Sequence, residues 1–77
     1  MQIPMHRLRE GQYGIIQQLR LPQPLLQRML DLGLTEGCRV ECLLRSPGAG
    51  PIAFAARGAV VALRQRDAAG ILVGGEP

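Results

Sequence analysis

The chain has 77 residues, of which 47% are hydrophobic and 19% charged, a balance typical of a folded domain rather than a disordered segment. This length indicates one domain, which we place over residues 1–77 with a core at about 5–74. The net charge of +3 comes from nine arginines spread singly along the sequence. That spacing favours a solvated surface over a nucleic-acid-binding patch.

Aromatic side chains are scarce, since Tyr13 and Phe54 are the only ones in the sequence. Binding modes that depend on aromatic platforms, such as base stacking or proline-rich peptide recognition, are therefore poorly supported. The N-terminus has no apolar run typical of a signal peptide, and no segment approaches the roughly 18 apolar residues of a membrane span. We expect a cytoplasmic chain without membrane insertion, in which Cys38 and Cys42 stay reduced.

The first predicted elements are strands. A short strand is expected to end at Leu8, and a turn punctuated by glycines follows. Residues 13–20 then alternate in hydrophobicity, which predicts a strand with one face buried. Its inner row is expected to hold Tyr13, Ile15 and Leu19. Gln17 interrupts that row, so the strand is predicted to bulge or to lie near an edge of the sheet.

Residues 25–32 predict a helix, with Pro24 in its first turn. Its apolar side chains fill an arc of about 160°, wider than a core-facing helix needs. They are Leu25, Leu26, Met29, Leu30 and Leu32. We favour burial of the whole arc as a plug of the barrel; the alternative leaves Leu30, at one margin, free for a partner.

A glycine-stopped joint follows this helix. Gly33 can adopt the left-handed conformation that closes a helix, which lets Leu34 fold back onto Met29. Residues 35–37 then suit a tight turn, with Gly37 at the last position of a type I arrangement.

The second half predicts strands alone. Residues 38–45 alternate, with an inner row of Cys38, Val40, Cys42 and Leu44 and an outer row of Arg39, Glu41, Leu43 and Arg45. A loop at 46–51 leads to a strand at 52–56, a hairpin turn at 57–58 and a strand at 59–63. A connector at 64–69, with a single 3₁₀ turn, precedes a last strand at 71–73 and a frayed tail at 74–77. Five or six short strands with one helix between the second and third predict a mainly β fold, a small barrel.

No motif in the sequence supports catalysis or a metal site. Cys38 and Cys42 lie about 13 Å apart if they share one face of a strand, too far to grip one zinc ion. His6 is the remaining soft ligand and has no evident acid or nucleophile partner. Free cysteines on an inner row behave as small hydrophobic residues. We therefore expect a non-enzymatic protein with no catalytic residues, no cofactor and no metal.

Two blocks of the sequence carry a resemblance to a known family. The first is residues 28–37, Arg-Met-Leu-Asp-Leu-Gly-Leu-Thr-Glu-Gly; the second is residues 50–64 with Asp67-Ala68 and 71–73. From about Leu8 to Val73 the chain resembles the FeoA domain of bacterial ferrous-iron transport. The family's usual Gly-Asp-Pro is Gly50-Pro51 here. The resemblance implies an SH3-like barrel with a helical insertion, cytosolic and not enzymatic, that acts on the cytosolic GTPase domain of the ferrous-iron permease FeoB.

The same domain type also occurs in metal-dependent repressors of the diphtheria toxin repressor class, but this chain has no winged-helix region. Our hypothesis is an adaptor that binds the FeoB GTPase domain; self-association stays open. The predicted contact residues are Leu30, Leu43, Arg39, Arg45 and Arg57. The alternative is an RNA- or ribosome-associated basic barrel. A ferrous-iron carrier built on Cys38, Cys42 and His6 ranks last.

Overall fold

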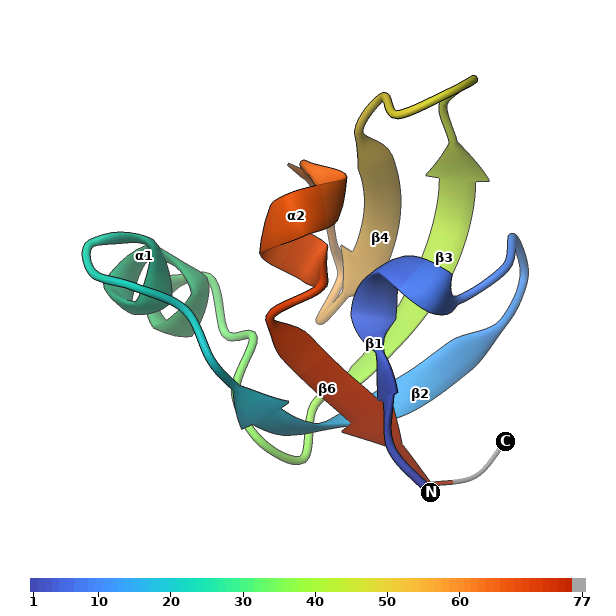
Figure 1. The fold of residues 1–77 in the computed structure, drawn as a ribbon. Coiled ribbons are helices and arrows are strands. Elements are labelled where there is room, and N and C mark those ends of the chain that lie inside the picture. Colours follow the sequence, from blue (N-terminus) through green and yellow to red (C-terminus); the bar gives the residue numbers. More distant parts are fainter. Residues whose placement is uncertain (76–77) are drawn as a thin grey trace.

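Six short strands form one antiparallel sheet, in the order β1-β6-β2-β3-β4-β5, in the computed structural model, which describes residues 1–75 (Figure 1). The strands are β1 (Ile3–Pro4), β2 (Tyr13–Leu19), β3 (Arg39–Arg45), β4 (Ile52–Ala56), β5 (Ala59–Leu63) and β6 (Ile71–Gly74). Helix α1 (Leu25–Asp31) lies between β2 and β3, as predicted. The helical turns are η1 (Met5–Arg7) and α2 (Gln65–Ala68).

The first strand is β1, which pairs with β6, and the prediction that it ends at Leu8 is wrong. Residues 5–7 form a 3₁₀ turn instead, closed by a 3.1 Å hydrogen bond from the Leu8 N–H to the Met5 carbonyl. Met5, in this turn, is completely buried. Because the turn begins at Met5, the chain leaves the sheet before it reaches Leu8.

β2 buries the face opposite to the predicted one at its start. Gly14 and Ile16 are buried there, whereas Tyr13 and Ile15 are half-buried. A Cβ on Gly14 would lie 3.0 Å from Val73 Cβ, so only glycine lets β6 approach this closely. The predicted bulge is confirmed between Ile16 and Gln18, although β2 is an interior strand. Its extra residue changes the parity of the strand, so Leu19 packs against the core as Ile16 does.

Helix α1 ends as predicted. The Leu34 N–H donates to the Met29 carbonyl at 3.0 Å and the Gly33 N–H to the Leu30 carbonyl at 3.0 Å, the two bonds of a Schellman motif. Gly33 has φ +90°, and Leu34 is fully buried. The following turn differs from the prediction: the Cys38 N–H donates to the Thr35 carbonyl, which places Gly37, at φ +90°, third rather than last. A positive φ at that position is typical of a type II turn.

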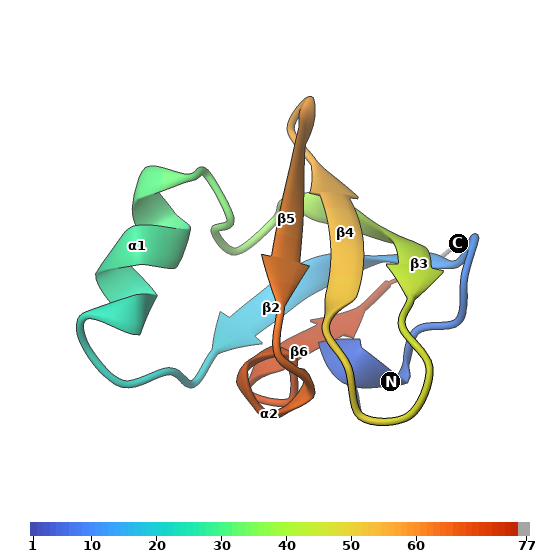
Figure 2. The same cartoon turned by 90° about the horizontal axis from the view of Figure 1, so that it is seen from above.

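The apolar arc of α1 is only partly buried, so the prediction that the whole arc plugs the barrel is wrong. Met29 is buried and Leu25 packs against the core, but Leu30 is 37% exposed and Leu32 44% exposed. The reason is position: α1 lies beside the barrel rather than inside it (Figure 2). The barrel is filled by its own strands, with Phe54, Ile52, Val40 and Ile71 fully buried.

β3 follows the predicted alternation up to a second bulge. Cys38, Val40 and Cys42 face the core, but Leu44 is 60% exposed, so its predicted inward position is wrong. The register shifts between Cys42 and Leu44, and Leu44 pairs with Ala53 on the outer face of β4. The extra residue at the bulge turns the end of the strand over.

The β4–β5 hairpin confirms the predicted turn and inner rows. Ala56 pairs with Ala59 across a two-residue loop in which Arg57 has φ +52° and Gly58 φ +79°. Two successive positive φ values are typical of a type I′ turn, whose twist matches that of the strands.

The connector after β5 holds a short α-helix, α2, where a 3₁₀ turn was predicted, because the Ala69 N–H reaches back four residues to the Gln65 carbonyl at 2.9 Å. β6 confirms the last predicted strand and extends it to Gly74. The rest of the predicted frayed tail, beyond residue 75, lies outside the described residues.

Candidate partner-binding surface

Arg39 and Arg57, two of the predicted contact residues, line one shallow depression on the outer face of the barrel. Glu41, Ala55 and other atoms of the β4–β5 turn complete its walls. The Arg39 guanidinium lies 3.9 Å from the centroid of the Tyr13 ring, a cation–π contact that orients it along the surface. Both arginines are exposed, so this depression presents positive charge to solvent.

Arg57 also joins this depression to the end of α1. A Cβ on Gly33 would lie 2.8 Å from Arg57 Cδ, so the aliphatic stem of Arg57 covers the glycine that stops the helix. Leu32 immediately precedes that glycine, and Leu30 lies in the last turn of α1. The structure therefore brings two predicted residues, Arg39 and Arg57, into one depression and places the end of α1, which carries Leu30, beside Arg57. Leu32, at the opposite margin of the apolar arc from Leu30, is also exposed although it was expected to be buried, and its marginal position was the available signal.

Leu43 lies elsewhere. It is four residues beyond Arg39 on β3, a separation of about 13 Å along a strand. Its exposed neighbour Leu44 pairs with Ala53, which in turn pairs with Ala62, so an apolar row crosses the outer face of β3, β4 and β5. Sequence alternation missed this row because the bulge reverses Leu44.

Arg45 is half-buried and holds the N-terminal segment onto the barrel. Its Nη1 donates to the His6 carbonyl at 2.6 Å and to the Leu8 carbonyl at 2.9 Å, and its backbone N–H donates to Glu10 Oε2 at 2.8 Å. The guanidinium thus satisfies carbonyls that the strand ladders leave free. The structure assigns Arg45 a fold-stabilising contact.

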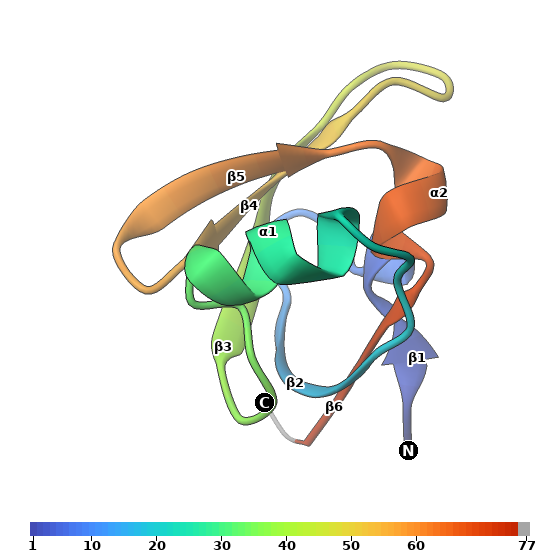
Figure 3. The same cartoon turned by 90° about the vertical axis from the view of Figure 1, so that its left-hand side faces the viewer.

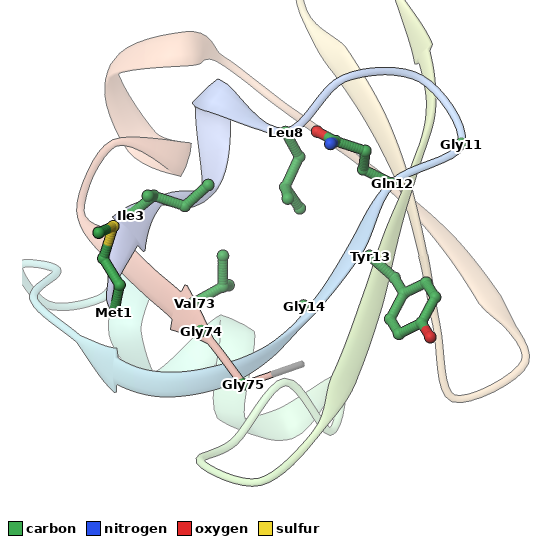
Figure 4. Close-up of a pocket in the computed structure, with 10 residues that line it drawn as sticks. All are labelled: Met1, Ile3, Leu8, Gly11, Gln12, Tyr13, Gly14, Val73, Gly74 and Gly75. Carbon is green, nitrogen blue, oxygen red and sulfur yellow. The ribbon is translucent and has the colours of Figure 1, made fainter. Parts of the chain in front are cut away.

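A separate cavity of about 330 Å³ opens between β1, the start of β2 and the end of β6 (Figure 4). Ile3, Leu8 and Val73 point into it, whereas the Tyr13 ring points away from it. Its walls are apolar side chains, glycines and Gln12, without an acidic, basic, histidine or cysteine side chain among the described residues. Glycines at 11, 14, 74 and 75 were its only sequence signal.

The two cysteines are free and buried, as predicted for an inner row. Burial raises the pKa of the Cys42 thiol, and nearby Glu10 and Glu41 act in the same direction against the opposing effect of Arg45. The thiolate that binds metal or attacks electrophiles is thus disfavoured at Cys42. His6 Nδ1 is buried and has no hydrogen-bond partner in the part of the chain that the structure describes. Among residues 1–75, no three His, Cys, Asp or Glu side chains gather as a metal site would require.

None of the helices in residues 1–75 is both long and apolar enough to cross a membrane.

Comparison with known proteins places this fold. A family model described as the FeoA domain matches residues 3–74. The crystal structure of an iron uptake regulatory protein, FeoA, shares 26% identity and a TM-score of 0.84, over 96% of this chain and 97% of that one. A manganese-dependent transcriptional repressor in complex with manganese shares 26% identity and a TM-score of 0.87, over 97% of this chain and 37% of the repressor.

A third structure, of Stenotrophomonas maltophilia FeoA complexed with zinc, is described as an SH3 domain protein. It shares 22% identity and a TM-score of 0.76, over 95% of this chain and 88% of that one, so it supports the fold alone. A search of curated proteins found no match. The FeoA model covers nearly the whole chain, and the barrel with its inserted helix is the fold of the FeoA structures. This protein therefore belongs to the FeoA domain family of ferrous-iron transport accessory proteins, with an SH3-like fold.

Proposed function

We propose that this chain is a non-enzymatic cytoplasmic accessory protein that binds the cytosolic GTPase domain of a FeoB-type permease and modulates ferrous-iron uptake. One observation carries the proposal: α1 stands beside the barrel and exposes Leu30 and Leu32, while the Arg57 side chain covers Gly33 at the end of the same helix. A helix in a small domain normally buries its leucines in its own core. Their exposure at a charged margin favours a protein partner.

The energetics support a contact of this kind. Burying a leucine side chain fully contributes about 1.5–3 kcal/mol, and Leu30 and Leu32 each leave part of that contribution unused in the free protein. Arg39 and Arg57 are both exposed. Acidic groups on the partner would therefore meet accessible guanidinium groups close to the helix that carries the exposed leucines, and apolar side chains with arginine are enriched at interface centres.

An RNA-binding barrel is the rival, and the positions of the arginines weigh against it. The Arg45 guanidinium donates to backbone carbonyls, and the Arg39 guanidinium lies over the ring of Tyr13, one of two aromatic residues in the sequence. Single-stranded RNA binding needs a continuous basic groove with stacking platforms. A salt titration separates the two: RNA binding weakens steeply between low and physiological salt, and failure to bind RNA at low salt removes the rival.

The test pairs pull-down of the permease's purified cytosolic domain with anaerobic ferrous-iron uptake in a deletion strain. Leu30→Glu should fold, lose binding and fail to restore normal uptake. Gln27→Glu is the matched control, because it adds the same charge to α1 at an exposed polar position; it breaks the 2.9 Å hydrogen bond from Gln27 Nε2 to Asp31 Oδ1 but should still bind as wild type. Leu43→Asp tests the other predicted contact: if it folds and binds unchanged, Leu43 lies outside the interface. Wild-type protein that fails to bind the domain would overturn the proposal.

A further inference from the structure

We propose that the partner is held by β-strand addition: an extended segment with acidic side chains pairs with the open edge of β5, in the groove between β5 and α1. This inference rests on the proposed function and states how the permease domain is bound. β5 is the last strand in the order β1-β6-β2-β3-β4-β5, so only one of its edges is paired within residues 1–75.

The unpaired edge of β5 presents free backbone groups. In a two-residue hairpin closed by Ala56 and Ala59, alternate residues of β5 bond to β4, so the N–H and C=O groups of Val60 and Ala62 point the other way. No backbone hydrogen bond in turns, loops or caps of the described residues involves Val60 or Ala62. Both residues are exposed, Val60 at 67%.

This edge also lacks the devices that proteins use to prevent strand pairing. Natural edge strands are usually short, bulged, covered or interrupted by charged residues or proline. β5 is Ala-Val-Val-Ala-Leu over five residues, without charge or proline, and its pairing with β4 runs without a register shift. A regular uncharged edge left open in a native fold indicates a site for another strand.

A groove lies between the second half of β5 and α1. Figure 3 shows these two elements side by side. On the α1 side it is lined by Leu25, Met29 and Leu32, and on the β5 side by Val61, Ala62 and Leu63. Because side chains of a strand alternate between two faces, one row of an added strand would lie against these leucines. The exposed Leu32 would thus contact the side chains of the added strand.

The charges along this groove select the occupant. Arg28 and Arg64 line it and are exposed, Arg57 lies at the hairpin end of β5, and Asp67 is the one acidic residue in the lining. A second copy of this chain, with a net charge of +3, would bring its own arginines against these. Charge complementarity therefore favours a segment rich in aspartate or glutamate over self-pairing.

Backbone amide hydrogen exchange tests the proposal without any mutation. The uniformly labelled protein is measured alone and with the permease's purified cytosolic domain. In the complex, exchange at Val60 and Ala62 should slow by about tenfold or more, because their N–H groups gain partners. Val61 and Leu63, already bonded to β4, should change little.

A pair of variants at one residue supplies a second test. Val60→Pro removes the outward N–H on an edge strand, where proline is tolerated, whereas Val60→Thr changes the same side chain and keeps the N–H. If both fold, Val60→Pro should bind the domain about tenfold more weakly and Val60→Thr about as well as wild type. Arg28→Glu with Arg64→Glu should also weaken binding, and the loss should shrink at high salt.

The outcomes separate the two proposals. Binding with unprotected Val60 and Ala62 amides, or with a Val60→Pro variant equal to Val60→Thr, overturns strand addition and leaves the proposed function standing. No binding by wild-type protein overturns both. Protection of Val60 and Ala62 in the protein alone, rising with its concentration, shows that a second copy occupies the edge and overturns the acidic partner.

Discussion

Arg57 packs its side-chain stem over Gly33, so the tip of the β4–β5 hairpin is joined to the end of α1. The two residues are 24 positions apart in the sequence. Glycine is required at position 33 for two reasons. It has φ +90°, and a Cβ would come within 2.8 Å of Arg57 Cδ. This contact holds the leucine-bearing helix next to the charged hairpin.

Gly33→Ala should therefore lower the free energy of unfolding by about 1–3 kcal/mol, because alanine pays for the left-handed conformation and displaces Arg57. Urea denaturation of both proteins measures the difference. Arg57→Ala in the same chain should recover the part due to the clash and leave the part due to φ. Equal stability of Gly33→Ala and wild type would show that this joint is not strained by a Cβ.

Arg57→Asn should separate stability from binding. Arg57 has φ +52°, a conformation that asparagine adopts more readily than arginine, so the turn itself should gain about 0.5 kcal/mol. The loss of the Arg57 stem over Gly33 offsets this gain, so the net stability should change little. Binding of the permease domain should nevertheless weaken, since the guanidinium is lost. Thermal unfolding and a titration with the domain measure the two effects. An Arg57→Lys control keeps the charge; if Arg57→Asn binds as tightly as this control, charge at the hairpin is irrelevant.

Arg45→Met should destabilise the fold by about 1–3 kcal/mol, because the carbonyls of His6 and Leu8 lose their donor. Arg39→Met is the comparison, since it removes an exposed arginine with a cation–π contact worth about 0.5–1 kcal/mol. Chemical denaturation should give a clearly lower free energy of unfolding for Arg45→Met than for Arg39→Met. The reverse order would mean that the Arg45 hydrogen bonds contribute little.

Met29→Ala and Leu30→Ala, adjacent in the sequence, should differ strongly. Met29 is buried, so its truncation should cost about 2–5 kcal/mol. Leu30 is 37% exposed, and its replacement by a good helix former should change stability by about 0.5 kcal/mol or less. Thermal unfolding distinguishes them, since 1 kcal/mol shifts Tm by about 4–8 °C in a domain of this size. Similar losses for both would mean that α1 is more buried than the structure shows.

Cys42 should make stability fall at alkaline pH. Burial raises the pKa of its thiol above the ordinary value of 9.0 in the folded state. The unfolded chain therefore releases this proton first. The stabilising contribution is complete below pH 9.0 and is lost as the pH rises through the raised pKa. Urea unfolding midpoints of wild type and Cys42→Ala, measured from below pH 9.0 upward, test this contribution. The midpoint of the variant should fall less steeply with pH than that of wild type. Parallel pH profiles would contradict the raised pKa.

Much of the architecture was predictable from local patterns. The glycine stop at Gly33, the hairpin turn at Arg57 and Gly58, and the inner rows of β4 and β5 follow from φ preferences and period-two alternation, which act over a few residues. Two of the errors occur where the strand register changes. A bulge was predicted at Gln17, but its effect on which face of β2 is buried was not. The bulge between Cys42 and Leu44 was not predicted at all.

The sequence alone determined the five longer strands, helix α1, the family and the residues able to form a core, because these depend on propensity and spacing within one segment. Only the tertiary structure decided which apolar residues stay exposed, how Arg45 is used and which strand has an open edge. Each of these depends on what a distant segment places beside the residue. Leu32 and Met29 share one short helix, yet the barrel wall covers one and not the other.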